Sequence, residues 1–165
     1  ASSNAVLFSE PYLALKRHFD ANSQRYVPHF QGVRKMAGQI TARAGSAEGG
    51  DLCVTPLTRV AGREDGLRAW INGELLPELL KQRGIMAAWY GEQDAATRAS
   101  VAADIPRQSD HFLDGVLVVE AVSDGALDAL MPLLAWERLK AQGAEPDVSA
   151  ARMRVCMSVH VPLKV

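Results

Sequence analysis

The feature that most constrains this chain is a proline set inside an amphipathic helix. Apolar residues recur every four positions at Leu67, Ile71, Leu75 and Leu79, a spacing that predicts one buried helical face. Proline costs about 3 kcal/mol in a helix interior, so a helix that contains Pro77 must distort around it. Short similar patterns surround prolines 28 and 132, which lie 49 residues before and 55 residues after Pro77. We interpret this recurrence as an internal repeat.

Strand-like segments flank each of the three predicted helices. Apolar runs and period-two alternation predict strands, and proline, glycine and capping residues bound the helices. The strands are expected at 5–8, 34–43, 52–55, 85–90, 112–122 and 153–161, and the helices at 9–27, 62–84 and 123–142. The strands 34–43 and 52–55 are close in sequence, which predicts a hairpin.

These elements predict an α+β fold, a ferredoxin-like antiparallel sheet with helices on one face. Two strand–helix–strand units make the βαββαβ arrangement, and the chain has three such units, or one and a half ferredoxin-like repeats. The predicted organisation is a βαββαβ unit at 1–92, a linker at 93–111 and an additional half-repeat at 112–165 packed on the same domain.

Composition restricts the partners and cofactors. The chain has 165 residues and a formal net charge of −1, which favours neither nucleic acid nor an anionic membrane as partner. No apolar run reaches the roughly 18 residues that span a bilayer, and we expect a cytoplasmic protein. Cys53 and Cys156 lie in apolar runs, where a free cysteine packs as a small hydrophobe. Metal-ligand spacing, a phosphate-binding loop and a dinucleotide fingerprint are all missing, so no cofactor is expected.

The helix around Pro77 also carries a family resemblance. The run Trp70-Ile71-Asn72-Gly73-Glu74-Leu75-Leu76-Pro77-Glu78-Leu79-Leu80 resembles the Trp-Tyr-x-x-Glu-His-x-Pro-x-Leu helix motif of EthD-like dimeric α/β-barrel proteins. This resemblance implies a homodimer whose sheets pack face to face, with a small apolar ligand between them. Where the motif has Tyr and His, this chain has Ile71 and Leu75. No catalytic role is therefore carried over to position 75.

The candidate site lies on the sheet face that the helices leave free. Alternation in the last strand places Arg154, Cys156, Ser158 and His160 together. We predict His160, Glu120 and Tyr90 as the acid/base and orienting groups, and Arg43, Arg154 and Ser158 as ligand-binding residues. Two plainer interpretations remain open, a solvated edge strand for His160 and core packing for Tyr90 beside Trp89.

Two functional hypotheses follow. The first is a cofactor-independent enzyme, a cyclase, isomerase, lyase or monooxygenase, acting on a small apolar oxygenated substrate. The second is a non-catalytic ligand-binding or assembly protein of the same fold. A cavity that joins His160 to Glu120 or Arg43 favours the enzyme, and a filled, dry interior favours the second hypothesis.

Overall fold

The computed structural model describes most of the chain as two compact units. The described residues are 9–17, 20–26, 29, 34–36, 38–46, 48–94, 111–146 and 151–155. The first unit spans 1–35 and 95–112 and contains helices α2 (Glu10–Arg17) and α3 (Ala21–Tyr26) and the parallel strand pair β1 (Arg34–Lys35) and β5 (His111–Phe112). The second, called here the sheet unit, spans 36–94 and 113–165.

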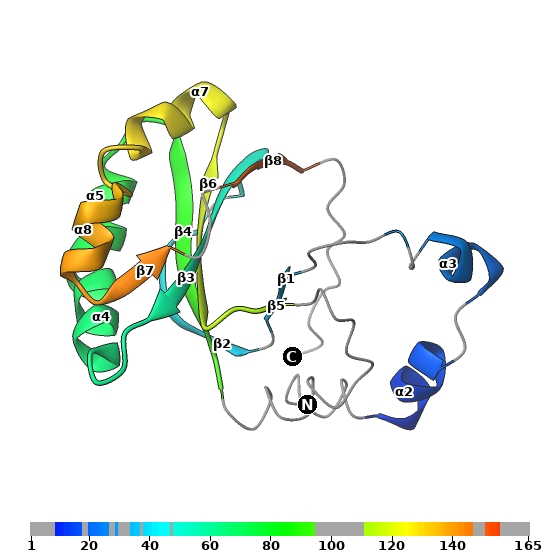
Figure 1. The fold of residues 1–165 in the computed structure, drawn as a ribbon. Helices are drawn as coiled ribbons and strands as arrows, with labels where there is room; N and C mark the ends of the chain where they lie inside the picture. Colours follow the sequence, from blue (N-terminus) through cyan, green and yellow to red (C-terminus); the bar gives the residue numbers. More distant parts are fainter. Residues whose placement is uncertain are drawn as a thin grey trace, which may run out of the picture. The chain divides into compact units, whose positions relative to one another are not determined.

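The sheet unit is built on one six-stranded antiparallel sheet, which confirms the predicted α+β class (Figure 1). Its order is β2 (Gly38–Gly45), β4 (Ile85–Gln93), β6 (Gly115–Ala121), β3 (Asp51–Arg59) and then β7 (Ala144–Pro146), with β8 (Ala151–Arg154) also paired to β3. The predicted hairpin between 34–43 and 52–55 is wrong, because β2 pairs with β4 and β3 pairs with β6. The strand with apolar residues on both faces, β6, thereby gains a neighbour on each side.

Two strand–helix–strand connections interleave in this sheet. The helical segment at 64–80 joins β3 to β4, and β6 lies between these two strands. The segment at 124–141 joins β6 to β7, with β3 between them. Strands from before 92 and after 112 therefore share one sheet. The division into 1–92, 93–111 and 112–165 itself stays a prediction, as does the cytoplasmic location.

Pro77 is accommodated by a wide turn in an otherwise continuous helical segment. Helix α4 (Glu64–Trp70) passes into the π-helical turn η2 (Ile71–Leu75) and then into α5 (Leu76–Leu80). The Leu76 N–H donates to the Ile71 carbonyl, five residues back. Because a proline ring conflicts with the carbonyl four residues before it, the extra residue in this turn relieves the conflict. The predicted apolar face is confirmed, since Leu67, Ile71, Leu75 and Leu79 are fully buried.

The predicted third helix is wrong as a continuous element. It is divided into α7 (Asp124–Leu127), the 3-10 turn η3 (Asp128–Leu130) and α8 (Trp136–Ala141), with Pro132 in the turn between them. Pro132 has no N–H for a helical hydrogen bond and its ring conflicts with the carbonyl four residues before it, and here the helix ends instead of widening. Pro146, which follows the predicted helix, lies in β7 opposite Leu57.

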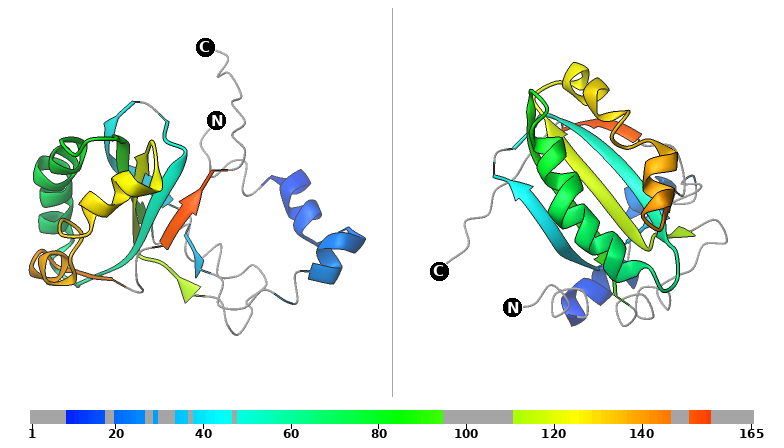
Figure 2. Two further views of the ribbon diagram at one scale, coloured as in Figure 1. Left: turned by 90° about the horizontal axis from the view of Figure 1, so that it is seen from above. Right: turned by 90° about the vertical axis from the view of Figure 1, so that its left-hand side faces the viewer.

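The helices α4, α5, α7 and α8 all cover the same face of the sheet (Figure 2). Leu117, Val119 and Ala121 of β6 belong to the core beneath them. Alternation places Val116, Val118 and Glu120 on the opposite face, which we call the helix-free face. Val116 and Val118 are also buried, so β6 is buried on both faces.

Pro56 lies within β3 at a locally unpaired edge. On one side it is opposite Val116 of β6. On the other side, the partners from β8 stop at Val54 and those from β7 begin at Leu57. A proline is tolerated in a strand where no neighbour requires its missing N–H, so the gap between β7 and β8 explains how β3 continues past it. No helix in the described part of the chain is both long and apolar enough to cross a bilayer.

Candidate functional site

Glu120 is an oriented carboxylate on the helix-free face. The Trp89 indole Nε1 donates to its Oε1 at 3.3 Å, and the backbone N–H of Gly49 donates to its Oε2 at 3.3 Å. Gly49 is required there, because a Cβ would lie 2.4 Å from the Ala121 amide nitrogen. Each carboxylate oxygen has two lone pairs, so both oxygens can accept one further hydrogen bond. The group is held in place and is not saturated.

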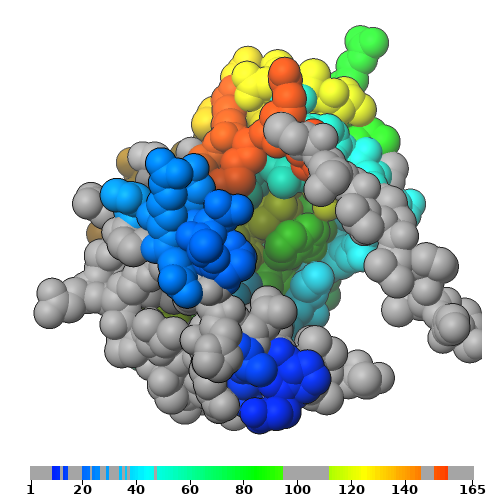
Figure 3. All heavy atoms as spheres, turned by 90° about the vertical axis from the view of Figure 1, so that its right-hand side faces the viewer, coloured from blue at the N-terminus to red at the C-terminus, as the bar shows by residue number. Residues whose placement is uncertain are grey.

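The surroundings of Glu120 are largely apolar. It lies opposite Leu52 of β3 and Ala87 of β4 in the strand register, and directly opposed residues share a face. Figure 3 shows this side of the molecule, with β4 side chains between those of β8 and of the cyan strands. Arg43 of β2 lies opposite Trp89 and is exposed. Two of the predicted site residues, Glu120 and Arg43, therefore share this face.

Tyr90 lies on the other side of the sheet. It is fully buried in the core beneath the helices, opposite Ala42 and Leu117. Burial, with the nearby charge of Glu92, raises the pKa of its hydroxyl well above the usual value. The structure therefore does not bring Tyr90 together with Glu120. The position of Tyr90 matches the core-packing interpretation.

Arg154 also lies away from Glu120. It is opposite Asp51 in the register, on the helix-covered face, and its Nε donates to Asp51 Oδ1 at 3.1 Å. The residue of β8 that shares a face with Glu120 is Met153, which is opposite Leu52 and 51% exposed. The prediction that Arg154 lies on the face that the helices leave free is wrong, because the pairing of β8 with β3 sets the opposite parity. His160, Ser158 and Cys156 lie outside the described residues.

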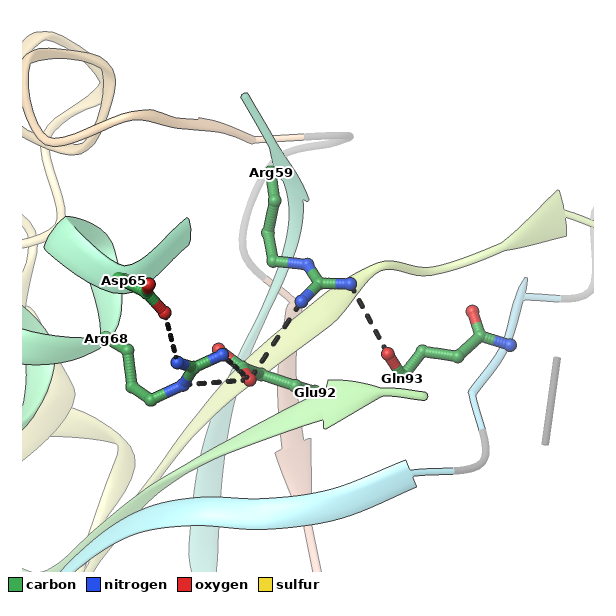
Figure 4. Close-up of polar contacts among 5 residues, drawn as sticks. All are labelled: Arg59, Asp65, Arg68, Glu92 and Gln93. Atoms are coloured by element: carbon green, nitrogen blue, oxygen red, sulfur yellow. Dashed lines mark hydrogen bonds and ion pairs between the residues drawn. The ribbon is translucent and has the colours of Figure 1, made fainter. Parts of the chain in front are cut away.

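A second polar cluster closes the end of the sheet where β3 and β4 finish. Arg68 of α4 donates from Nη2 and Nε to Glu92 Oε2, at 2.8 and 3.1 Å. Arg59 Nη1 is 3.9 Å from the same oxygen, and its Nη2 donates to the Gln93 carbonyl at 3.3 Å. Figure 4 shows both guanidinium groups converging on Glu92, and Asp65 accepting from Arg68. The cluster ties α4 to the ends of two strands.

Several buried polar atoms at this sheet end have no hydrogen-bond partner. They are Glu92 Oε1, Tyr90 Oη, Arg59 Nε and both side-chain amide atoms of Gln93. Glu92 is only 6% exposed, so its pairing with Arg68 offsets part of the cost of burying a charge. The atoms are closed to solvent, so a substrate does not reach them. The arrangement is that of a structural clamp.

Sequence reasoning missed this clamp for an identifiable reason. Glu92 is at the end of an apolar strand and Arg68 is on the second turn of a helix. Considered separately, each residue is typical of a surface charge. Only the register that sets Glu92 opposite Gly115 at the sheet end brings the helix over it. The alternation of the strand could have indicated it, because Tyr90 and Glu92 share one strand face. An acid on the same face as a buried residue needs a cation as partner.

The remaining sulfur and acidic groups give no further reactive centre. Cys53 is buried and free, and burial raises the pKa of its thiol, which keeps it protonated and unreactive. Within the described ranges, no group of three or more His, Cys, Asp or Glu side chains is placed to hold a metal ion.

Comparison with known proteins identifies no relative. No family model, no curated protein and no solved structure matches this chain.

Proposed function

We propose that this chain is a ferredoxin-like protein of the dimeric α/β-barrel type that binds a small, largely apolar, oxygenated molecule on the helix-free face. The interleaved connections β3–helix–β4 and β6–helix–β7 support the fold assignment, because they form a βαββαβ set in one antiparallel sheet. The Pro77 helix motif supports the family assignment. The observation that carries the binding proposal is Glu120, an oriented carboxylate among apolar neighbours.

The chemistry of the face defines the ligand in outline. Leu52 and Trp89 are half-buried and offer accessible apolar surface, with the buried Ala87 and Val118 beside them, and burial of an apolar ligand there is favourable. Glu120 retains acceptor capacity, so the ligand presents a hydroxyl or N–H donor to it. This combination agrees with the apolar oxygenated molecule that the family resemblance implies.

Binding is tested by titrating the protein with 4-propylphenol, followed by two-dimensional ¹⁵N–¹H NMR. We expect saturable shifts of the Trp89 indole N–H and of β4 and β6 amides. Glu120→Gln weakens binding about tenfold, because a hydrogen bond to a charged acceptor is lost. The control is Glu74→Gln, an exposed acid on the helical segment, which leaves the affinity unchanged. Equal affinity in both variants, or no saturable shift, contradicts the proposal.

Catalysis without a cofactor is the second candidate, and the fixed orientation of Glu120 favours it. A general base must be positioned within reach of the proton that it removes. The cyclase, isomerase and lyase reactions share proton abstraction beside a carbonyl. The test is exchange of the α-protons of 4-phenyl-2-butanone in D₂O, measured by NMR. Exchange above the buffer rate that is lost in Glu120→Gln supports catalysis, and exchange at the buffer rate leaves binding as the function.

Homodimerisation is part of the proposal. Met153 is exposed on the helix-free face, and sheet-to-sheet packing in a dimer would bury it. Light scattering after size exclusion should give a dimer for the parent protein and a monomer for Met153→Lys. Met131→Lys, at an exposed methionine on the helix side, should remain dimeric. A parent protein that is strictly monomeric at micromolar concentration excludes this dimer.

A further inference from the structure

Three side chains of different chemistry form a row across the helix-free face. Arg43 on β2 lies opposite Trp89 on β4. Trp89 in turn donates its indole hydrogen to Glu120 on β6 at 3.3 Å. The strands β2, β4 and β6 are consecutive in the sheet. A cation, an aromatic ring and an anion therefore follow one another across three strands, with Glu120 two residues along β6 from Val118, which lies directly opposite Trp89.

Arg43 differs from the other arginines of the six-stranded sheet. Arg59, Arg152 and Arg154 all reach carboxylates. Arg43 is exposed and has no ion-pair partner among the described residues. A guanidinium on the surface of a sheet, beside a tryptophan and without an acid, is suited to a planar anion from outside the chain.

We propose that the ligand of this face is an aromatic acid with a hydroxyl group at its far end, which deepens the proposed function and rests on it. The carboxylate binds Arg43, the ring lies against Trp89, and the hydroxyl donates to Glu120. The two charged residues fix the direction, because a carboxylate at Glu120 would be repelled. Their Cα atoms are two strand spacings apart across the sheet and two residues apart along it, roughly 12 Å in all. A para-hydroxylated phenylpropenoate spans about this distance when the hydrogen bond at each polar end is included.

Simpler ligands engage only some of these three side chains. A neutral phenol engages Trp89 and Glu120 and leaves Arg43 unused. An unsubstituted aromatic acid engages Arg43 and Trp89 and gives Glu120 no donor. A cationic amine at Glu120 satisfies the carboxylate but contributes nothing at the other end. Only a ligand with an acid and a distal donor uses all three side chains.

The experiment compares three probes and two pairs of variants. The probes are 4-hydroxycinnamate, its methyl ester, which lacks the charge, and cinnamate, which lacks the hydroxyl. Dissociation constants are measured by ¹⁵N–¹H NMR with the Trp89 indole signal as reporter. The variants are Arg43→Gln with Arg83→Gln as its control, and Glu120→Gln with Glu74→Gln as its control. Both control residues are exposed and lie away from the row.

We expect 4-hydroxycinnamate to bind about tenfold more tightly than its ester, and this preference to vanish in Arg43→Gln but persist in Arg83→Gln. We expect cinnamate to bind several-fold more weakly, and that difference to vanish only in Glu120→Gln. If the acid and ester bind equally while Glu120→Gln still weakens both, the aromatic-acid inference is overturned and the proposed function stands. If no probe, including 4-propylphenol, gives a saturable shift, both are overturned.

Discussion

The two faces of the sheet differ in what their side chains are bound to. On the helix-covered face, apolar residues of three central strands pack against the helices, and its charged groups are paired within the chain, as Glu92 is with Arg68. On the helix-free face, Glu120 is oriented but not saturated and Arg43 has no ion-pair partner among the described residues.

This difference separates stability from recognition. A closed face with paired charges contributes to folding, and little of it is accessible to another molecule. A face with oriented but unsaturated polar groups beside apolar surface is suited to a ligand. Substitutions on the helix-covered face should therefore change the free energy of unfolding most. Substitutions on the helix-free face should change ligand affinity most.

The largest expected effect is the loss of apolar volume beneath the helices. Leu79→Ala removes a fully buried side chain of α5 and should lower the free energy of unfolding by about 2–5 kcal/mol. The matched substitution Leu52→Ala, at a half-buried position of the helix-free face, should cost roughly half of that or less. Urea unfolding measures both, and equal losses would remove the distinction between the faces.

Breaking the clamp at the sheet end should have the next largest effect. Arg68→Gln leaves Glu92 Oε2 with only Arg59, at 3.9 Å, so a largely desolvated charge loses its main partner. We expect a loss of about 1–3 kcal/mol in unfolding free energy. Arg43→Gln, which removes an unpaired charge, should stay within about 0.5 kcal/mol of the parent protein. A similar loss in both variants would mean that the clamp adds nothing to stability.

Tyr90→Phe should leave stability unchanged or raise it by about 1 kcal/mol, because it removes a buried hydroxyl without a partner.

Since the pKa of Tyr90 is raised in the folded protein from its ordinary value of 10.0, unfolding releases its proton above pH 10. The stability of the parent protein should fall there by up to about 1.4 kcal/mol per pH unit, and this component should be missing in Tyr90→Phe. Denaturant midpoints between pH 9 and 11 measure it, with the exposed Tyr26→Phe as control. An identical alkaline slope in Tyr90→Phe and the parent would contradict the assignment.

The smallest stability effect is expected at the candidate ligand site. Glu120→Gln keeps an acceptor for the Trp89 indole and should change the free energy of unfolding by no more than about 0.5 kcal/mol. The Trp89 indole proton should shift in the NMR spectrum, since its acceptor has lost a charge. A loss of unfolding free energy comparable to that of Arg68→Gln would mean that Glu120 stabilises the fold and is not a binding residue.

Much of the local structure was predictable, and the two prolines show where prediction stopped. The periodicity around Pro77 correctly predicted a helix with Leu67, Ile71, Leu75 and Leu79 buried, because the helical segment before Pro77 accommodates it with one wide turn. The same reasoning failed at Pro132, where the helix breaks into two short pieces. The pattern alone did not distinguish a proline that a helix absorbs from one that ends it.

The candidate site was predictable in part. Glu120 and Arg43 lie on the face that parity assigned to them, but Tyr90 and Arg154 lie on the other. For Tyr90 the error came from the aromatic pair Trp89 and Tyr90, whose members point to opposite faces, so that one of the two had to be core. For Arg154 it came from a strand whose pairing partner was unknown.

The sequence by itself determined which segments form helices and strands, which helical face is apolar, and that β6 is buried on both sides. These properties follow from side-chain periodicity, which is local. Only the tertiary structure decided the strand order, the pairing of β8 with β3, and hence which polar residues share a face. The reason is that a shift of one residue in strand register moves every side chain to the other face, and register is set by contacts between segments far apart in the chain.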